Sequence, residues 1–296
     1  MLPLYDTHAH FYTADTAMYP IDATGAREGA EALIARITAD PGTPERVFSL
    51  WDAAGVRSGA AVQYNTAYKT DNRYALKIAD DHPSRIGAVV ILSATDPETP
   101  GKLREMALAH GVTGLRLVGF SDESGTFDFL SGDSAMATWA EAARLGLALV
   151  LMIRLNPGES PEPALIRVGE LARRFETVRI VLDHCCWPGN MPGSDSVGFT
   201  PSHRALAAAA NVSFKVTSLN FGRFEREGID ASCFIRAAAD LYGADRLMWG
   251  SDFGNTLTNY ALLAEAARRS GALLNDAERS AYFYDSGAAM FAQRHS

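Results

Sequence analysis

The feature that most constrains the fold of this chain is a regular alternation of short apolar runs with alanine-rich helical stretches. The two kinds of segment repeat at intervals of roughly thirty residues, the length of a strand–helix–strand unit. The expected strands cover residues 4–10, 59–64, 86–92, 112–118, 147–154, 178–184, 212–217 and 246–252. Residues 149–151 and 180–182 are apolar throughout, which is typical of strands that are buried on both faces.

Helices are expected between these strands. They cover residues 26–38, 44–54, 72–81, 100–109, 135–145, 163–175, 201–210 and 231–242. Thr43 is placed to cap the second of them, Pro44 fits its first turn, and Gly55 follows its end. Eight strands with interleaved helices in 296 residues predict an α/β fold, a (β/α)8 TIM barrel, with residues 1–296 as a single domain. An open doubly wound sheet is the alternative, and it is disfavoured because no glycine-rich phosphate-binding sequence follows the first strand.

The composition narrows the class of partner. A net charge of −8 argues against a nucleic-acid surface and favours a small molecule. The three cysteines Cys185, Cys186 and Cys233 form no disulfide framework. Cys185 and Cys186 also lack metal-ligand spacing, so we expect these two to be buried bystander thiols. We find no signal peptide before Asp6 and no apolar run that could span a bilayer, and we therefore expect a cytoplasmic protein without membrane contact. The oligomeric state is left open.

Polar side chains gather where the expected strands end. Successive strand residues point to opposite faces, so His8 and His10 point the same way from the first strand. The active sites of (β/α)8 barrels lie at the carboxyl ends of the strands. The further candidates at these ends are Gln63, Asn65, Arg116, Arg154, His184, Lys215 and Asp252. Each could instead be a hydrogen-bonded core residue or could balance a neighbouring charge, but their number on one rim favours a functional site.

Three of these residues put positive charge into an acidic protein. Arg116, Arg154 and Lys215 need partners, and the most economical one is an anionic substrate, because guanidinium groups bind carboxylates in a bidentate manner. The alternative is that acidic neighbours such as Asp122 or Glu123 neutralise them. Tyr19, in the irregular loop after the first strand, is a candidate for the mouth of the substrate pocket.

The chain resembles the amidohydrolase superfamily, and within it the lactonase-like branch that includes 2-pyrone-4,6-dicarboxylate lactonase, sugar-lactone lactonases and galactarolactone isomerase. The resemblance covers essentially the whole chain. It depends on the segments Asp6–His10, Tyr19–Pro20, Val181–His184, Lys215–Ser218 and Trp249–Asp252. It implies a (β/α)8 barrel, in agreement with the strand count.

The resemblance also bears on metal binding. In metal-dependent members the ligands correspond to His8, His10, His184 and Asp252, with a further residue from strand four or five. Met152 stands where the fifth strand commonly carries a histidine, and Arg116 adds positive charge nearby. Thioether sulfur suits zinc poorly in a site of nitrogen and oxygen ligands. We therefore expect no required cofactor; Zn²⁺ or Mn²⁺ held by His8, His10, His184 and Asp252 is the alternative.

These residues supply the chemistry of lactone hydrolysis. Asp252 is the expected base that activates water, and His8, His10 and His184 would polarise the carbonyl or hold the oxyanion. The sequence thus predicts a lactonase that opens a carboxylated pyrone, muconolactone or sugar-acid lactone. Three alternatives stay open: a metal-dependent decarboxylase, a lactone isomerase, and a non-catalytic barrel that binds a small molecule.

Overall fold

The computed structural model describes residues 2–122 and 125–293 of the chain. Its centre is a ring of eight parallel strands whose order in the sheet is the order in the sequence. The strands are β1 (Leu4–Ala9), β2 (Val56–Val62), β3 (Ile86–Ile91), β4 (Val112–Gly119), β5 (Ala148–Ile153), β6 (Arg179–Leu182), β7 (Val212–Thr217) and β8 (Leu247–Gly250). The α/β prediction, a (β/α)8 barrel, is confirmed.

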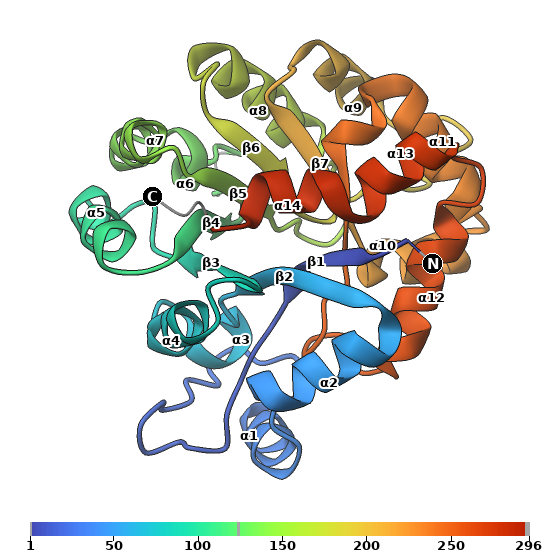
Figure 1. Cartoon of the computed structure of the whole chain (residues 1–296). Helices are drawn as coiled ribbons and strands as arrows, with labels where there is room; N and C mark the ends of the chain where they lie inside the picture. Colours follow the sequence, from blue (N-terminus) through green and yellow to red (C-terminus); the bar gives the residue numbers. More distant parts are fainter. Residues whose placement is uncertain (1, 123–124, 294–296) are drawn as a thin grey trace.

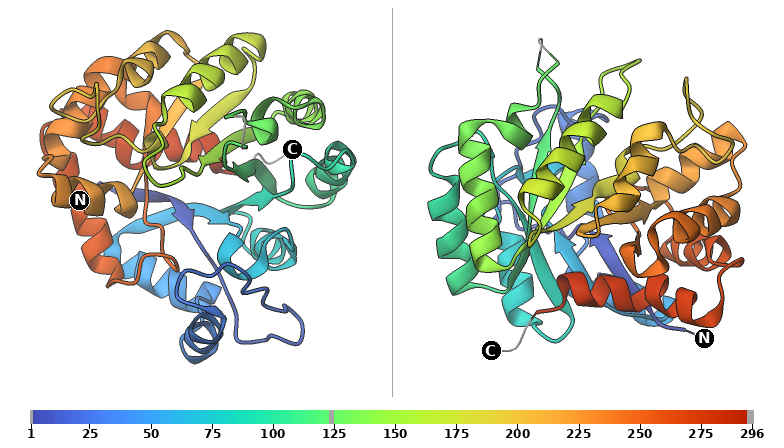
Figure 2. Two further views of the ribbon diagram at one scale, coloured as in Figure 1. Left: turned by 180° about the vertical axis from the view of Figure 1, so that it is seen from behind. Right: turned by 90° about the horizontal axis from the view of Figure 1, so that it is seen from above.

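The helices surround the strands, as Figures 1 and 2 show from three sides. They are α1 (Ala30–Ala39), α2 (Pro44–Ala54), α3 (Asn65–Tyr68), α4 (Arg73–Asp81), α5 (Thr99–Ala109), α6 (Asp128–Ser131), α7 (Asp133–Leu145), α8 (Glu162–Arg174), α9 (Pro201–Ala205), α10 (Ser218–Glu227), α11 (Ala231–Tyr242), α12 (Tyr260–Ser270), α13 (Asp276–Ser280) and α14 (Ser286–Phe291). Among the described residues no helix is long and apolar enough to cross a membrane.

The barrel closes between β8 and β1 just beyond the end of β8. The backbone N–H of Asp252 donates to the carbonyl of His8 at 2.8 Å, and that of His10 donates to the carbonyl of Phe253 at 3.0 Å. Asp252 adopts a left-handed φ of 55° at this junction. The closure therefore sets the two histidines of β1 directly beside the aspartate that follows β8.

The amino-terminal half of the barrel interior is apolar. Small and branched side chains of several strands pack there against Phe291 of α14, and the group, which we call the inner layer, comprises Tyr5, Ala60, Val62, Val89, Ala148, Val150, Val181, Met248 and Phe291. Helix α14 lies across this end of the barrel (Figure 1) and contacts β1, β2, β3, β4 and β8. Burying the valine, methionine and phenylalanine side chains of this layer stabilises the fold by about 1.5–3 kcal/mol each.

The predicted boundaries mostly agree with the structure, and the differences are local. The seventh strand and helices α2, α4 and α11 begin and end within a residue of expectation. Strand β6 ends at Leu182 rather than at His184, because the chain turns into a left-handed conformation there. The short helices α3 and α6 and the helices α10, α12, α13 and α14 were not predicted.

Candidate active site

Three polar side chains meet where β1 and β8 close the barrel. His8 Nε2 and His10 Nε2 each lie 3.6 Å from Asp252 Oδ1. The candidate ligand atoms of the three residues lie within 4.8 Å of one another, and all three side chains are buried. We call His8, His10 and Asp252 the histidine–aspartate triad. The shared face that the sequence predicts for the two histidines is present, and Asp252 completes it.

Two atoms of this triad lack a partner. Neither His8 Nε2 nor Asp252 Oδ1 has a hydrogen-bond partner among the described residues, although both atoms are buried. Buried polar atoms are nearly always satisfied in folded proteins, and exceptions call for an explanation such as a bound ion. The two atoms lie 3.6 Å apart, so the triad turns one nitrogen and one oxygen toward its own centre.

The remaining polar atoms of the triad are held by neighbours. His10 Nδ1 lies 2.9 Å from the carbonyl of Val62, so it donates there and leaves Nε2 with a free lone pair. The hydroxyl of Thr256 donates to Asp252 Oδ2 at 2.9 Å, which leaves Oδ1 turned toward the histidines. Each partner fixes a ring or a carboxylate in the orientation that a metal ligand needs.

The electrostatics keep Asp252 ionised. Burial alone would raise the pKa of this carboxyl, but the polar contact with His10 and the charges of His8, His10 and His184 outweigh burial and bring the pKa to about 2. Burial holds the pKa of His8 well below its usual range. At neutral pH the triad thus combines a carboxylate with an uncharged His8.

Asp6 organises the triad from behind, a role that sequence reasoning did not assign. Its carboxylate accepts from the backbone N–H groups of His8 and Ser251, and from the hydroxyls of Ser251 and Tyr260. This buried carboxylate therefore ties the end of β1 to the segment after β8. An acidic residue two positions before His8 on a buried strand was the available sequence signal.

Asp183, which follows β6, forms ion pairs with two cations that we had expected to meet the substrate. Its Oδ2 lies 2.6 Å from Arg116 Nε, and its Oδ1 lies 2.9 Å from Lys215 Nζ. Burial would raise the pKa of Asp183, but the charges of Lys215 and Arg116 hold it well below the usual range. His8 Nδ1 lies 3.4 Å from the same Oδ1. Asp183 is thus a carboxylate partner for Arg116 Nε and for Lys215 within the chain itself, so the burial of these two cations does not require an anionic substrate.

His184 lies beside the triad on an unusual stretch of backbone. Residues 184–187 all have φ between 52° and 64°, although none is a glycine. Each such residue costs about 1–2 kcal/mol, so surrounding contacts must hold the turn. The ring of His184 lies 5.3 Å from that of His8 and stacks on Trp187 at 4.8 Å. Its Nδ1 lies 2.6 Å from the hydroxyl of Thr217, and burial lowers its pKa to about 4.

Arg154 is the expected cation for which the described part of the chain provides no carboxylate partner. It is exposed at the end of β5, and its guanidinium lies 4.4 Å from the centre of the Phe120 ring. Burial and the nearby charges of Arg27 and Arg116 lower its pKa. No described carboxylate forms an ion pair with Arg154. Of the acidic neighbours considered from the sequence, Glu123 lies outside the described residues, and Asp122 accepts from Thr126.

Among the described residues, the other predicted substrate residues form no hydrogen bond with the triad. The amide of Gln63 donates to the carbonyls of Lys69 and Asp71, so this side chain holds the chain after β2 rather than facing a substrate. Asn65 is half-buried at the start of α3. Tyr19 is also half-buried, and its ring packs 4.9 Å from that of Tyr74.

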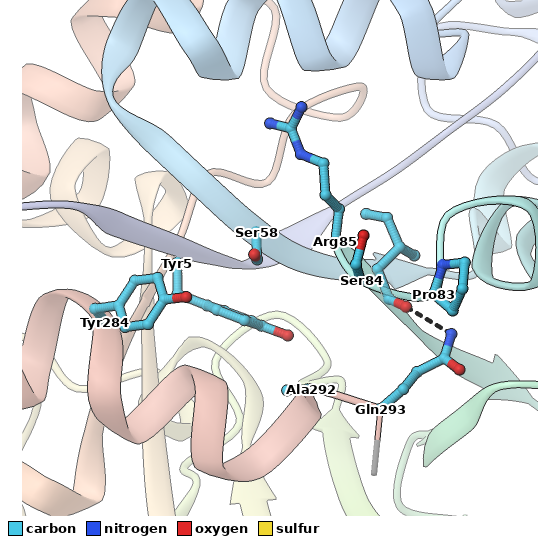
Figure 3. Close-up of a pocket in the computed structure, with 9 residues that line it drawn as sticks. Tyr5, Ser58, Pro83, Ser84, Arg85, Tyr284, Ala292 and Gln293 are labelled. Carbon is cyan, nitrogen blue, oxygen red and sulfur yellow. Dashed lines mark hydrogen bonds between the residues drawn. The ribbon is translucent and has the colours of Figure 1, made fainter. Parts of the chain in front are cut away.

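A separate cavity of about 150 Å³ lies at the opposite, amino-terminal end of the barrel (Figure 3). It is lined by Tyr5, Ser58, Pro83, Ser84, Arg85, Ile86, Tyr284, Ala292 and Gln293. Arg85 Nη2 donates to Asp52 Oδ1 at 2.8 Å, and Gln293 Nε2 donates to the carbonyl of Ile86. This cavity holds no pair of candidate acid–base residues, so the chemistry belongs to the triad end.

Known proteins share both sequence and fold with this chain. L-Fucono-1,5-lactonase of Burkholderia ambifaria is 29% identical over 216 residues, which cover 71% of this chain and 69% of the lactonase. An amidohydrolase of Burkholderia multivorans with bound zinc superposes with a TM-score of 0.73 at 22% identity, over 99% of this chain and all of the other. A protein assigned as a 2-pyrone-4,6-dicarboxylic acid hydrolase, from Pseudomonas putida, has a TM-score of 0.69 at 22% identity, and 98% of each chain is covered.

The expectation that no metal cofactor is required is wrong. The Burkholderia multivorans structure holds zinc, and a dihydroxybenzoic acid decarboxylase of a Polaromonas species, with a TM-score of 0.69 at 14% identity over 98% of this chain and 97% of the other, holds manganese. In this chain the described residues bring two ligand groups together, the triad and the set His8, Asp183 and His184.

Both reasons for that expectation fail on geometry. The ion pair of Arg116 with Asp183 at 2.6 Å weakens the repulsion between Arg116 and a cation in the site. Met152 is half-buried near the end of β5, but the triad supplies two imidazoles and a carboxylate without it. Two nitrogen ligands and one oxygen ligand are a set that zinc accepts in catalytic sites, with a position left open.

The family follows from the whole length of the chain. The amidohydrolase family model matches residues 5–292, which include every strand of the barrel except the first residue of β1. The chain is an enzyme of the amidohydrolase superfamily.

Proposed function

We propose that this amidohydrolase is a metal-dependent lactonase that opens a lactone ring by adding water to its carbonyl. The observation that carries the proposal is the convergence of His8, His10 and Asp252, in which one nitrogen and one carboxylate oxygen have no hydrogen-bond partner in the described part of the chain and lie turned toward each other. The kinship with L-fucono-1,5-lactonase supports a lactone as the substrate.

The triad fits a divalent cation. His8 and His10 would offer Nε2, and Asp252 would offer Oδ1; His10 and Asp252 are already oriented by Val62 and Thr256. When bound, zinc or manganese supplies Lewis-acid chemistry, which makes water more acidic and polarises a carbonyl. Asp183 stands behind His8 at Nδ1, as an outer carboxylate commonly does behind a ligating histidine.

Asp252 is the proposed base. Its low pKa means that it is ionised at neutral pH and ready to accept a proton from the attacking water. The same carboxyl group then returns that proton to the ring oxygen that leaves when the lactone opens. A carboxylate is a weak base, but a lactone is an activated acyl donor and demands less of the base than an amide does.

His184 is proposed to stabilise the carbonyl oxygen. Its Nδ1 contacts the hydroxyl of Thr217 at 2.6 Å, and the same hydroxyl lies 3.4 Å from Asn220 Oδ1. The proposed role needs the tautomer in which the hydroxyl proton is shared with His184 Nδ1 and the ring proton is on Nε2. A neutral imidazole with this proton can donate to the oxygen on which negative charge develops, an effect that contributes of order 10²-fold or more.

Arg154 is proposed to bind an acidic group of the substrate. It is the member of the expected cation set that no described carboxylate neutralises, and it lies on the exposed rim at the end of β5. The stacked Phe120 holds the guanidinium plane, which suits bidentate binding of a carboxylate. The proposal therefore favours a lactone that carries a carboxylate some distance from the ring carbonyl.

Decarboxylation is the second candidate function, because a manganese-bound decarboxylase shares the fold. The two reactions differ in product. Hydrolysis adds water and releases an acid, whereas decarboxylation releases carbon dioxide and leaves a neutral ring. The identity of 29% with the lactonase, against 14% with the decarboxylase, favours hydrolysis.

A substrate panel tests the proposal. The zinc-loaded protein is incubated with L-fucono-1,5-lactone, with 2-pyrone-4,6-dicarboxylate, with muconolactone and with 2,6-dihydroxybenzoate, and acid release, carbon dioxide release and product mass are recorded. We expect acid release with a mass gain of one water for at least one lactone. Carbon dioxide release without lactone opening would replace the lactonase by a decarboxylase.

A further inference from the structure

We propose that His203, at the start of α9, is a positioning residue that holds the left-handed turn of residues 184–187 and thereby aims His184 into the active site. The inference rests on the proposed role of His184. His203 is fully buried and lies outside the triad, and the chemistry described above does not use it.

The turn is held through its carbonyl groups. Asn220 Nδ2 donates to the carbonyl of His184 at 2.8 Å, and Arg223 Nη1 donates to that of Trp187 at 3.1 Å. His203 Nε2 lies 3.2 Å from the carbonyls of both Cys185 and Cys186. Every carbonyl of the turn thus accepts from a side chain on α9 or α10, and among the described side chains His203 serves the two central residues.

The tautomer of His203 follows from its other nitrogen. The backbone N–H of Thr200 lies 3.3 Å from His203 Nδ1, and a backbone N–H can only donate. Nδ1 is therefore an acceptor, and the proton of the neutral ring is on Nε2, where it points at the two carbonyls. Burial lowers the pKa of His203 to about 4, so the ring is neutral at physiological pH.

The link to His184 is direct. Four successive left-handed residues other than glycine are strained, and such a backbone persists only where its surroundings overdetermine it. His184 is the first of the four, and its ring direction depends on the turn, since it stacks on Trp187 at the far end. Losing the central contacts would let the turn relax to ordinary backbone angles and swing the imidazole away from the carbonyl it polarises.

Two amide variants separate this role from general stability. They differ in reach: His203→Asn can accept from Thr200 but cannot reach the carbonyls, whereas His203→Gln is one methylene longer and can do both. With the best lactone of the panel, we expect kcat of His203→Asn to fall about 10- to 100-fold, while KM and bound zinc change less than about twofold. His203→Gln should recover kcat to within about threefold of the parent.

Tyr242→Phe is the matched control. The Tyr242 hydroxyl donates to the backbone carbonyl of His203 at 2.8 Å without touching the turn. Its removal should lower thermal stability and leave kcat unchanged. Equal kcat in the asparagine and glutamine variants, or kcat falling in step with melting temperature in all three proteins, would overturn the positioning role.

A measurement that needs no substrate keeps this inference separate from the proposed reaction. In protein labelled with ¹⁵N-histidine, the His203 ring should show the Nε2–H tautomer, and the His184 ring should give one sharp set of signals that broadens or shifts in His203→Asn but not in His203→Gln. An Nδ1–H tautomer of His203 in the parent protein would overturn the inference, even if no variant folded and no lactone were hydrolysed.

Discussion

The two ends of the barrel interior are built from the same strands and differ in almost every physical respect. At the amino-terminal end, the inner layer of small apolar side chains packs against Phe291, and α14 covers it. At the carboxyl end, the inward positions carry His8, Arg116, Asp183 and Lys215, all buried. Burial of apolar atoms stabilises the fold, whereas burial of charge costs free energy unless the charge is paired. The comparison indicates that the inner layer stabilises the fold. The buried charges at the carboxyl end lower the stability, and they are the groups that the chemistry needs.

The largest expected effect is on turnover at the polar end. Asp252→Asn should lower kcat about a thousandfold or more, because an amide cannot accept the proton of the attacking water. The melting temperature should change little, since the backbone contacts of Asp252 to His8 remain. Near-normal turnover in this variant would remove Asp252 from the role of base.

The inner layer should respond in the opposite way. Met248→Ala leaves a cavity in this layer and should lower the free energy of unfolding by about 2–5 kcal/mol. Turnover at temperatures below the new melting point should stay within a few-fold of the parent. Chemical denaturation and initial rates measured on the same sample check this prediction. A loss of kcat without a loss of stability would show that the two ends do not differ in the proposed way.

A smaller effect is expected at the rim. Arg154→Met should raise KM for acidic lactones by an amount that corresponds to about 1.5–3 kcal/mol, the range for a hydrogen bond to a charged group. Neutral lactones should be affected much less, and Arg27→Met is a useful companion because Arg27 lies near Arg154. An equal rise in KM for acidic and neutral lactones would count against a role of Arg154 in binding an anionic group.

The smallest effect concerns stability outside the barrel. Glu141 on α7 is held by Arg144 at 2.6 Å and by Arg104 at 2.9 Å, and these hydrogen bonds lower its pKa to about 2. A lowered carboxyl pKa stabilises the fold above the ordinary value of 4.5, and this contribution is lost as the pH falls toward 2. Because both arginines are about half exposed, solvent screening limits the effect to about 1 kcal/mol.

The test is a comparison of pH profiles. Glu141→Gln should be less stable than the parent at pH 7, and the gap in unfolding free energy should narrow as the pH drops from about 5 to 3. A gap that is independent of pH would show that lost packing, rather than the charge of Glu141, causes the difference.

The sequence carried the fold because the barrel is a repeat. Alternating strands and helices of fixed length admit few closed arrangements, and the polar strand ends then point to one rim. The sequence could not show which charged side chains on this rim form ion pairs with one another. The carboxylate that pairs with Arg116 and Lys215 is Asp183, which precedes His184 in the sequence but was given no role.

Two other differences from prediction are the direction of Gln63 and the early end of β6. The first could have been inferred from the sequence, and the second could not. Ala60 and Val62 belong to the inner layer, so the two-residue period of a strand turns Gln63 the other way, as its contacts with Lys69 and Asp71 agree. The early end of β6 had no such signal, because His184, Cys185, Cys186 and Trp187 are not residues that favour left-handed backbone. Their conformation comes from tertiary contacts with α9 and α10.

Removal of the metal tests the central claim most directly. The protein is treated with a strong chelator, its metal content is measured by elemental analysis, and hydrolysis of the best lactone is followed before and after zinc or manganese is added back. We predict that kcat falls at least about a hundredfold, roughly 2.7 kcal/mol of barrier, and returns in proportion to the metal bound by His8, His10 and Asp252. Metal-free protein that keeps most of its kcat would contradict the account.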